Sequence, residues 1–372
     1  MATSGLNMSR RIRRTPFTDK AQQYGASGFT VVNHMLLPKA FERSVEEDFL
    51  HLRQHVQLWD VSCQRQVEIS GRDSAKLVQL MTPRDLRNAQ IGQCLYVPLV
   101  DDAGGLINDP VLLKLAEDRF WLSIADSDVL LWAKGLALGA GMDVRIEEPD
   151  VSPLAIQGPK AEDLVAALFG EDIRQIKFFR FGTIEFQGTK QVIARTGYSK
   201  PGGFEIFMQG SHFGAALWDT IWSAGQAYSI SPGCPNVPDR IEAGLLSLGN
   251  EFTRENNPFE IGLGKYCKLD GSIDFIGREA LQKITRDGVK QEIRGIVFDG
   301  GKCPPCAIPW PVKAEDGRQV GQVTSAGWSP RLKQNVGLSM IARGYWTDGT
   351  AVTVQTSDGQ SRRGEVTSLP FK

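Results

Sequence analysis

The stretch RTGYSKPGGFEI, residues 195–206, holds the residues of this chain best suited to bind a flat polar ligand. Two adjacent glycines, Gly202 and Gly203, would let a ligand approach the backbone, because glycine has no side chain. Glu205 lies in an apolar strand, where a carboxylate is costly to bury unless a cation or a hydrogen-bond donor faces it. The stretch predicts strand, glycine turn and strand, with Glu205 directed into a site. The alternative is a hairpin whose Glu205 points to solvent, which is the common environment of a glutamate.

A CPPC motif at residues 303–306 is the second pattern with chemical potential, because C-x-x-C can be redox-active or half of a zinc site. The sequence has no second C-x-x-C, and its four histidines lie far away along the chain. The two prolines predict an irregular turn. We therefore expect no metal and no redox role, and we interpret the six scattered cysteines as reduced thiols of a cytosolic protein. The cysteines are Cys63, Cys94, Cys234, Cys267, Cys303 and Cys306, and the histidines are His34, His51, His55 and His212.

The elements that would position these residues follow from the spacing of apolar side chains. Helical spacing predicts helices over about 41–55, 74–82, 127–141, 160–170 and 212–225. On the last of these, Trp218 and Trp222 stand four residues apart and should belong to the core. Two successive runs of strands and helices have a related order, which suggests two ferredoxin-like α+β units. From about Lys290 onward, short apolar strands alternate with Gly, Pro and Asp turns, which predicts a β-rich third domain.

Composition is typical of a globular protein of two or three domains: 372 residues, 41% hydrophobic, 23% charged, with a formal net charge of −1. That balance gives no general attraction to nucleic acid or to an anionic membrane. The basic run at residues 10–14 is short and lacks interleaved aromatic residues, so we expect a solvated or ligand-facing terminus. No apolar stretch approaches the ~20 residues that span a bilayer, and no secretory signal is evident. We expect a cytoplasmic location.

Five stretches resemble, in the same order, the glycine cleavage T-protein family of folate-dependent aminomethyltransferases. They are LWDVSCQRQVEISGRDS (58–74), GQCLYVPLVDDAGGLINDP (92–110), RTGYSKPGGFEI (195–206), RIEAGLLSLGNEF (240–252) and DFIGREAL (274–281). A later stretch, VTSAGWSP (323–330), is similar to the C-terminal domain of that family. SRRIRRTPF (9–17), NHMLLP (33–38) and TRENNPFEIGLGKYC (253–267) look most like the branch that demethylates dimethylsulfoniopropionate. The resemblance spans nearly the whole chain.

The resemblance implies an α+β fold with the three-domain cloverleaf of a T-protein. Two ferredoxin-like units would interleave, and a C-terminal β-barrel or jelly-roll-like domain would complete a central folate channel. The expected first unit, which would bind folate, comprises residues 1–54 and 152–231. The second comprises residues 55–151 and 232–288, and the C-terminal domain comprises residues 289–372.

The resemblance also implies tetrahydrofolate as the methyl acceptor, and it assigns residues to hold it. Glu205 would accept hydrogen bonds from the pterin amino and ring N–H groups. Arg240 would lie near the folate carboxylate, and Tyr96 and Tyr198 would line the channel. Arg195 is a further candidate for folate binding. The alternatives are an ordinary charge at a helix start for Arg240 and half-buried core positions for the tyrosines.

The pair Asn108 and Asp109 departs from the family, which typically has an aspartate at the position of Asn108, credited with proton handling at the folate amine. Asparagine cannot act as a general base. This difference argues against glycine cleavage chemistry and fits a sulfonium donor, whose thioether leaves without being protonated. We expect Asn108, Asp109 and Tyr198 to be the catalytic residues, with the pair orienting the folate amine. For one of the pair, a turn stabilised by its own side chain is the alternative.

A sulfonium or ammonium donor would also bind to aromatic faces, which attract such a cation by ~0.5–2 kcal/mol. The candidates for this cage are Trp121, Phe181, Tyr198 and Trp328, with Trp59 more remote. A donor that carries a carboxylate would need a cation too, and Lys39 or Lys200 could supply it.

The function expected from the resemblance is transfer of a methyl group from dimethylsulfoniopropionate, or a close onium acid, to tetrahydrofolate. Three alternatives stay open: an aminomethyltransferase that works with a lipoyl carrier protein, a folate-dependent demethylase of a betaine or methylamine, and a non-catalytic folate-binding protein. We expect a small-molecule substrate, no nucleic acid or membrane partner, and no metal. For the oligomeric state of the protein, we consider a homodimer.

Overall fold

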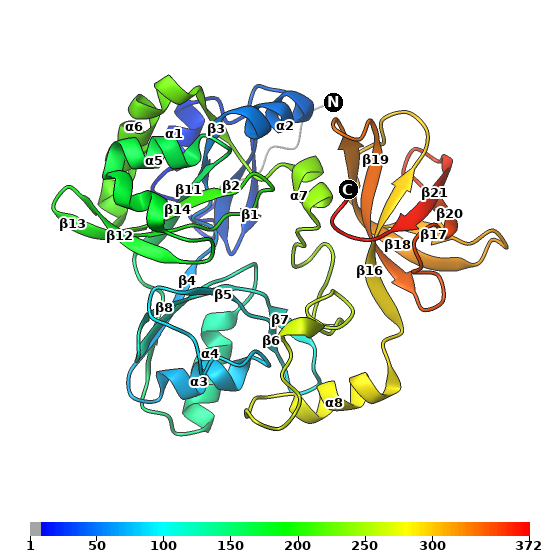
Figure 1. Ribbon diagram of the computed structural model, residues 1–372, viewed down its shortest axis with the longest axis horizontal. Helices are drawn as coiled ribbons and strands as arrows, with labels where there is room; N and C mark the ends of the chain where they lie inside the picture. The colour runs from blue at the N-terminus through cyan, green and yellow to red at the C-terminus, as the bar shows by residue number, and fades with distance from the viewer. Residues whose placement is uncertain (1–8) are drawn as a thin grey trace.

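The structure is a computed structural model that describes residues 9–372, and it is α+β as predicted. Figure 1 shows a six-stranded sheet with its helices at the upper left, a five-stranded sheet at the lower left and a closed barrel at the right. The smaller elements outside these three bodies are α1 (Thr18–Gln23), β1 (Gly28–Val32), β2 (Met35–Ala40), β6 (Leu99–Val100), β7 (Leu106–Asn108) and α8 (Arg278–Asp287).

The six-stranded sheet has the strand order β12-β13-β14-β11-β3-β15. Its strands are β3 (Val56–Asp60), β11 (Val151–Gln157), β12 (Phe181–Phe186), β13 (Thr189–Ala194), β14 (Gly203–Gln209) and β15 (Ile230–Gly233). Helices α5 (Ala161–Phe169) and α6 (Gly214–Gly225) cover one face, where Leu164 and Trp218 are fully buried in the core. Trp222 packs partly buried against the same core, so the prediction for both tryptophans is confirmed.

The five-stranded sheet has the order β10-β4-β9-β8-β5 and is covered by α3 (Ser74–Met81) and α4 (Val129–Gly139). Its strands are β4 (Gln66–Ser70), β5 (Cys94–Tyr96), β8 (Val111–Ala116), β9 (Arg119–Ser123) and β10 (Arg145–Glu147). All of its strand pairs are antiparallel. The apolar sides of both helices pack on this sheet, as their spacing predicted.

Strand β3 bears on one expected boundary. The sequence analysis assigned residues 55–151 to the second unit, but β3 pairs antiparallel with β11 and parallel with β15 in the six-stranded sheet. All five residues of β3 are buried, because this strand lies inside the sheet and not at its edge. We propose that the chain crosses from the first unit to the second after Asp60; the other boundaries stay predictions.

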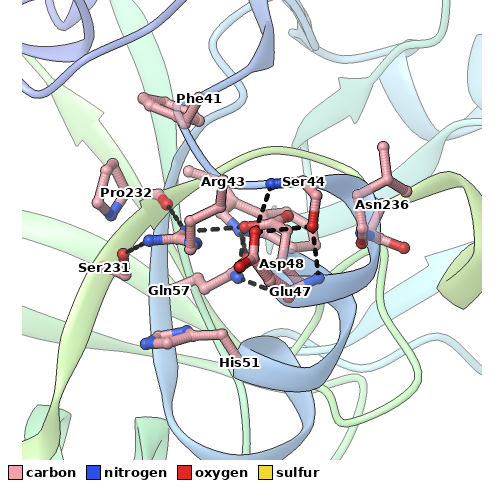
Figure 2. A network of polar contacts seen from close by, with 12 residues as sticks. Phe41, Arg43, Ser44, Glu47, Asp48, His51, Gln57, Ser231, Pro232 and Asn236 are labelled. Atoms are coloured by element: carbon pink, nitrogen blue, oxygen red, sulfur yellow. Dashed lines mark hydrogen bonds and ion pairs between the residues drawn. The ribbon is translucent and has the colours of Figure 1, made fainter. Parts of the chain in front are cut away.

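Helix α2 (Val45–Gln54) begins later than the predicted range of 41–55. Ser44 caps it: the Ser44 hydroxyl accepts from the Glu47 backbone N–H, and the Glu47 carboxylate accepts from the Ser44 backbone N–H. Figure 2 shows Arg43, just before this cap, reaching Ser231, the Pro232 carbonyl and Asp48. These bonds fix the start of α2 against β15.

The C-terminal domain is a closed six-stranded barrel with the order β16-β19-β18-β17-β20-β21, which confirms the predicted β-rich domain. Its strands are β16 (Gln291–Phe298), β17 (Trp310–Lys313), β18 (Gln319–Ser329), β19 (Gln334–Ala342), β20 (Ala351–Gln355) and β21 (Ser361–Thr367). Alternate side chains fill the barrel, with Trp310, Val323 and Val354 at its centre.

Helix α7 (Val237–Ala243) joins the barrel to the first unit through buried carboxylates. Glu242 accepts from the Ser329 hydroxyl at 2.5 Å and from Arg331 Nε at 2.7 Å, both in the barrel. Arg53 of α2 donates to the same carboxylate at 3.1 Å and is ion-paired with Asp239 at 2.9 Å. A buried carboxylate needs such partners, so docking of the barrel and placement of α7 depend on each other.

Candidate active site

A cavity of about 2470 Å³ lies where the three bodies meet. Its walls include Tyr198 from the first unit, Tyr96 and Asp109 from the second, and Trp328 from the barrel. Eight of the residues that the sequence singled out for binding or catalysis line this cavity. They are Tyr96, Asp109, Tyr198, Arg240, Arg195, Lys39, Lys200 and Trp328.

The Asp109 carboxylate is held by the Tyr96 hydroxyl, which donates to it across the ends of β7 and β5. Burial raises the pKa of Asp109 to about 7, against the lowering effect of this hydrogen bond. Burial also raises the pKa of Tyr96, and the adjacent Asp109 charge raises it further. The ring of Tyr266 meets that of Tyr96 edge-on, with 6.0 Å between centroids. A carboxylate that titrates near neutral pH is suited to proton exchange with a ligand.

Asn108 has a different place from the one we expected. Its side chain is fully buried and does not line the cavity. Its amide donates to the Ala125 carbonyl at 3.1 Å and to the Ser127 hydroxyl at 2.8 Å, and its carbonyl accepts from the Ala125 N–H at 3.0 Å. These internal hydrogen bonds give Asn108 a structural role, and its expected contact with the folate amine stays a prediction. Neighbouring residues of an extended segment point to opposite sides, and Asp109 is the one that lines the cavity.

We expect the Asn108→Asp variant to be destabilised by about 2–4 kcal/mol at neutral pH. The new carboxylate would lose both donated hydrogen bonds and would lie buried against the Ala125 carbonyl, without a cation to offset its charge. Denaturant unfolding at pH 7 measures the loss. Asp102→Asn, at an exposed position of the same loop region, is the control. A variant as stable as the wild type, or one with much higher activity, would contradict this structural role.

The turn between β13 and β14 confirms the predicted strand, glycine turn and strand. Gly203 has a φ of +159°, and a Cβ there would come within 2.0 Å of the Ile156 carbonyl oxygen, so only glycine fits. The Lys200 N–H donates to Asp239 at 2.9 Å, and the Tyr198 hydroxyl donates to the Leu246 carbonyl at 2.8 Å. The hydroxyl is thus bound to protein, while the residue forms part of the cavity wall.

Glu205 is buried on β14, at 5% exposure, and the structure does not include it in the cavity wall. The Thr196 hydroxyl donates to one of its oxygens at 2.5 Å. Among the described residues, no hydrogen bond reaches its second oxygen, and burial raises the pKa of the group. Its neighbours Gly203 and Phe204 do line the cavity. The carboxylate therefore keeps free capacity to accept hydrogen bonds, while its contact with a ligand stays a prediction.

Arg240 belongs to a buried polar cluster between α7 and the barrel. Its guanidinium donates to Glu251 at 3.0 Å and to the Ser325 hydroxyl at 2.6 Å. Glu251 also accepts from the Ser247 N–H at 2.7 Å and from Ser325. All the hydrogen-bond partners described for Arg240 belong to the protein itself. The cluster therefore holds the cavity wall near Tyr198 in place, and contact of Arg240 with a ligand stays a prediction.

Two members of the expected aromatic cage lie outside the cavity wall. Trp121 is 1% exposed, its indole N–H donates to Glu68 at 2.7 Å, and its ring packs between the two sheets beside Phe207. Phe181 packs against the same layer between the sheets. The packing of one sheet on the other uses both rings, so the expected contact of Trp121 and Phe181 with the donor stays a prediction that this packing does not support.

The remaining candidates, Arg195, Lys39 and Trp328, do line the cavity. Arg195 is ion-paired with Glu162 at 2.5 Å and donates to the Ile176 carbonyl at 3.2 Å. Lys39 is exposed at the end of β2. These positions agree with ligand binding at the cavity, and their individual roles stay predictions.

Two family models cover this architecture. The model of the GCVT N-terminal domain matches residues 17–271, and that of the glycine cleavage T-protein C-terminal barrel domain matches residues 292–372. The chain belongs to the glycine cleavage T-protein family. The crystal structure of the glycine cleavage system aminomethyltransferase T from Bartonella henselae has the same fold, with a TM-score of 0.87 at 23% identity, over 97% of this chain and 98% of that one.

Within the T-protein family, two curated relatives differ in their similarity to this chain. A dimethylsulfoniopropionate demethylase from Ruegeria pomeroyi is 51% identical over 94% of this chain and 95% of its own length. An aminomethyltransferase from Caldanaerobacter subterraneus is 32% identical over 94% of this chain and 93% of its own length. The similarity thus covers more than nine tenths of each chain, and this chain shares more of its sequence with the demethylase.

Several residues in the wall of this T-protein cavity were missed by the sequence analysis. Tyr266 stands in a stretch quoted for its resemblance, and Phe178 is 72% exposed beside the strained Phe179, which has a φ of +57°. The CPPC loop also lines the cavity, where burial raises the pKa of Cys303 to about 11 and that of Cys306 to about 12. The CPPC spacing and the resemblance of residues 253–267 were the available signals; nothing local marks Phe178, because distant segments bring the cavity wall together.

Residues 9–372 contain neither a cluster of metal ligands nor a membrane-spanning helix. No group of three or more His, Cys, Asp and Glu side chains is arranged to hold a metal ion. In the same part of the chain, no helix combines the length and the apolar character needed to cross a membrane.

Proposed function

We propose that this T-protein family member is a tetrahydrofolate-dependent demethylase that transfers a methyl group from dimethylsulfoniopropionate to tetrahydrofolate. The products would be 5-methyltetrahydrofolate and methylmercaptopropionate. The observation that carries this proposal is the 51% identity to a dimethylsulfoniopropionate demethylase, over nearly the full length of both chains. The aminomethyltransferase relative, at 32% identity, is much more distant.

The cavity and the residues in and behind its wall support the proposal of a bound folate. The volume exceeds the 300–1,000 Å³ of common ligand pockets, so a folate and a small donor can be held together. Asp109 and Tyr96 supply a carboxylate and a hydroxyl at the cavity, and Glu205 keeps an oxygen without a described partner. Carboxylates pair well with the adjacent N–H groups of a pterin.

Bound tetrahydrofolate supplies an amine nucleophile for the methyl group. The chain's own task is to align that amine with the donor carbon and to exclude water. The Asp109 carboxylate would accept the hydrogen of the amine and take up its proton after methyl transfer. Tyr96 holds the Asp109 carboxylate in place. The departing thioether is neutral, so no residue has to protonate it.

We propose that the ring of Tyr198, which lies in the glycine turn, forms part of the aromatic cage for the onium group of the donor. We expect Tyr198→Leu to raise the KM for the donor about fivefold, because the aromatic face that attracts the onium group is lost. Steady-state kinetics at saturating folate measures this change. Tyr198→Phe is the matched control: it removes only the hydroxyl bond to Leu246 and should leave the KM within about twofold. An unchanged KM in the leucine variant would remove Tyr198 from the cage.

An aminomethyltransferase is the second candidate, and one observation favours it. The expected loss of the catalytic carboxylate at Asn108 argued against glycine cleavage chemistry, but Asp109 presents a carboxylate to the cavity. Asp109 could therefore accept a proton in either activity. Demethylation of a betaine or methylamine, and folate binding without turnover, are the other outcomes to be distinguished.

The deciding experiment incubates the purified protein anaerobically with tetrahydrofolate and dimethylsulfoniopropionate, and follows both products by mass spectrometry. Formation of 5-methyltetrahydrofolate together with methylmercaptopropionate establishes the reaction. Parallel reactions with glycine betaine, and with an aminomethyl-lipoyl carrier protein, test the alternatives. Folate binding without any of these products would refute the demethylase.

We also propose that the protein works in the cytoplasm and takes part in sulfur metabolism. All six of its cysteines are free, which suits a reducing compartment. A homodimer stays a prediction, which light scattering would test.

A further inference from the structure

The face of Trp328 carries an ammonium group from the protein itself. Trp328 lies on β18 in the cavity wall, and Lys302 Nζ stands 6.0 Å from the centroid of its ring. The same Nζ is ion-paired with Glu46 at the start of α2. All three residues line the cavity, and the pair joins the barrel to the first unit across it.

The contacts of the Lys302 ammonium with Trp328 and Glu46 are weak. A distance of 6.0 Å is at the outer range of cation–π contact. The side chains of Lys302 and Glu46 are 61% and 43% exposed, and an ion pair with such exposure contributes little. A competing cation can therefore displace the ammonium without breaking buried structure.

The three groups are complementary to a zwitterion. An onium group can take the place of the Lys302 ammonium, with the indole face on one side and the Glu46 carboxylate beside it. The displaced Lys302 ammonium is then free to pair with a carboxylate a few bonds away. A plain cation would use the first contact only, and a plain acid the second only.

We propose that Trp328, Glu46 and Lys302 form a recognition site for onium acids at the solvent-exposed edge of the cavity, with Lys302 as an internal stand-in for the onium group. This inference deepens the proposed function and rests on it for the identity of the donor. It assigns the first capture of the donor to these residues. The onium group would then move inward to the Tyr198 ring and to the wall that carries Tyr96 and Asp109, where the methyl group is transferred.

The test measures binding and needs no turnover. Calorimetry on the full chain, without folate, compares tetramethylammonium, a cation alone, with glycine betaine, a cation with a carboxylate. Trp328→Leu should weaken both about fivefold. Lys302→Met should tighten tetramethylammonium binding about threefold, because the competitor is gone. The affinity of the same variant for glycine betaine should rise by less than threefold, or fall. The reason is that Lys302, the partner of the betaine carboxylate, is also missing.

The control is Lys283→Met, which removes an exposed lysine that is ion-paired with Asp287 on α8 and does not line the cavity. It should bind both probes like the wild type. Tetramethylammonium affinity that is equal in the wild type and Lys302→Met, or undetectable in both, overturns the proposal. So does unchanged binding in Trp328→Leu. If the demethylase assay fails while this binding pattern holds, only the reaction is wrong; if turnover is found without the pattern, only the recognition site is wrong.

Discussion

Replacing Asp109 with asparagine should lower kcat for methyl transfer about 10²-fold, since a positioned general base typically contributes 10²–10⁴-fold. The substitution keeps the shape of the side chain, and an asparagine carbonyl can still accept from the Tyr96 hydroxyl. The variant should therefore fold normally, and circular dichroism and thermal unfolding check this. What it loses is the charge that accepts the proton of the attacking amine.

The pH profile separates this role from simple positioning. Burial raises the pKa of Asp109 to about 7, so its ionised fraction falls as the pH drops through 7. We expect the wild-type rate at saturating substrates to fall tenfold per pH unit below that value, and the asparagine variant to lack this inflection. Rapid-quench measurements between pH 5.5 and 8.5 would follow it. A variant with wild-type kcat, or one that keeps the inflection, would exclude Asp109 as the base.

For Glu205→Gln, we expect affinity for tetrahydrofolate to fall about 10²-fold while the protein becomes no less stable. A carboxylate that accepts two pterin N–H groups makes charge-assisted bonds of ~1.5–3 kcal/mol each, and an amide can accept only one of them. The glutamine carbonyl can still accept from Thr196, so the local fold is kept. Anaerobic calorimetry with tetrahydrofolate measures the affinity, and Glu205→Ala should behave similarly.

The stability of the same variant should depend on pH. Burial raises the pKa of Glu205 in the folded protein above its ordinary value of 4.5. Ionisation is then harder in the folded state, so this group costs stability once the pH exceeds 4.5, and the cost is complete above the raised pKa. Glu205→Gln should therefore gain stability over the wild type at pH 8 and not at pH 4.

The matched control is Glu185→Gln, on the exposed side of β12, which should change neither affinity nor stability. Equal folate affinity in the wild type and Glu205→Gln would refute the assignment of Glu205 to the pterin. A large loss of stability in that variant would instead show that its carboxylate supports the fold.

Local patterns predicted the elements well where one face of each is apolar. The helices α3 to α6 lie within the predicted ranges, because their apolar side chains recur at helical spacing and pack on one sheet each. The glycine turn before Glu205 was predicted from the adjacent Gly202 and Gly203, and the structure leaves no room for a Cβ at Gly203. The barrel followed from short strands separated by turns.

The site was harder to predict, because it depends on which side of a strand a residue faces and on contacts between bodies. Asn108 and Asp109 are adjacent and similar in size, yet one is tied to Ala125 and the other faces the cavity. A shift of the strand by one residue would exchange the sides that the two side chains face. Local sequence patterns do not specify that register. Trp121 and Phe181 were assigned to the cage because aromatic residues suit onium ions, and the packing between the sheets, which uses both, has no local pattern.

The carboxylates of Glu242 and Glu251 also set an order of events during synthesis. Their hydroxyl partners in the barrel, Ser329 and Ser325, are translated 87 and 74 residues later. At ~5–20 residues per second, a ribosome needs about 4–17 s to deliver them. Until then, α7 and the wall beside Tyr198 lack the partners that hold them, so the growing chain carries both α+β units without a finished binding site. The enzyme would acquire ligand affinity only at the end of its synthesis, in one late step.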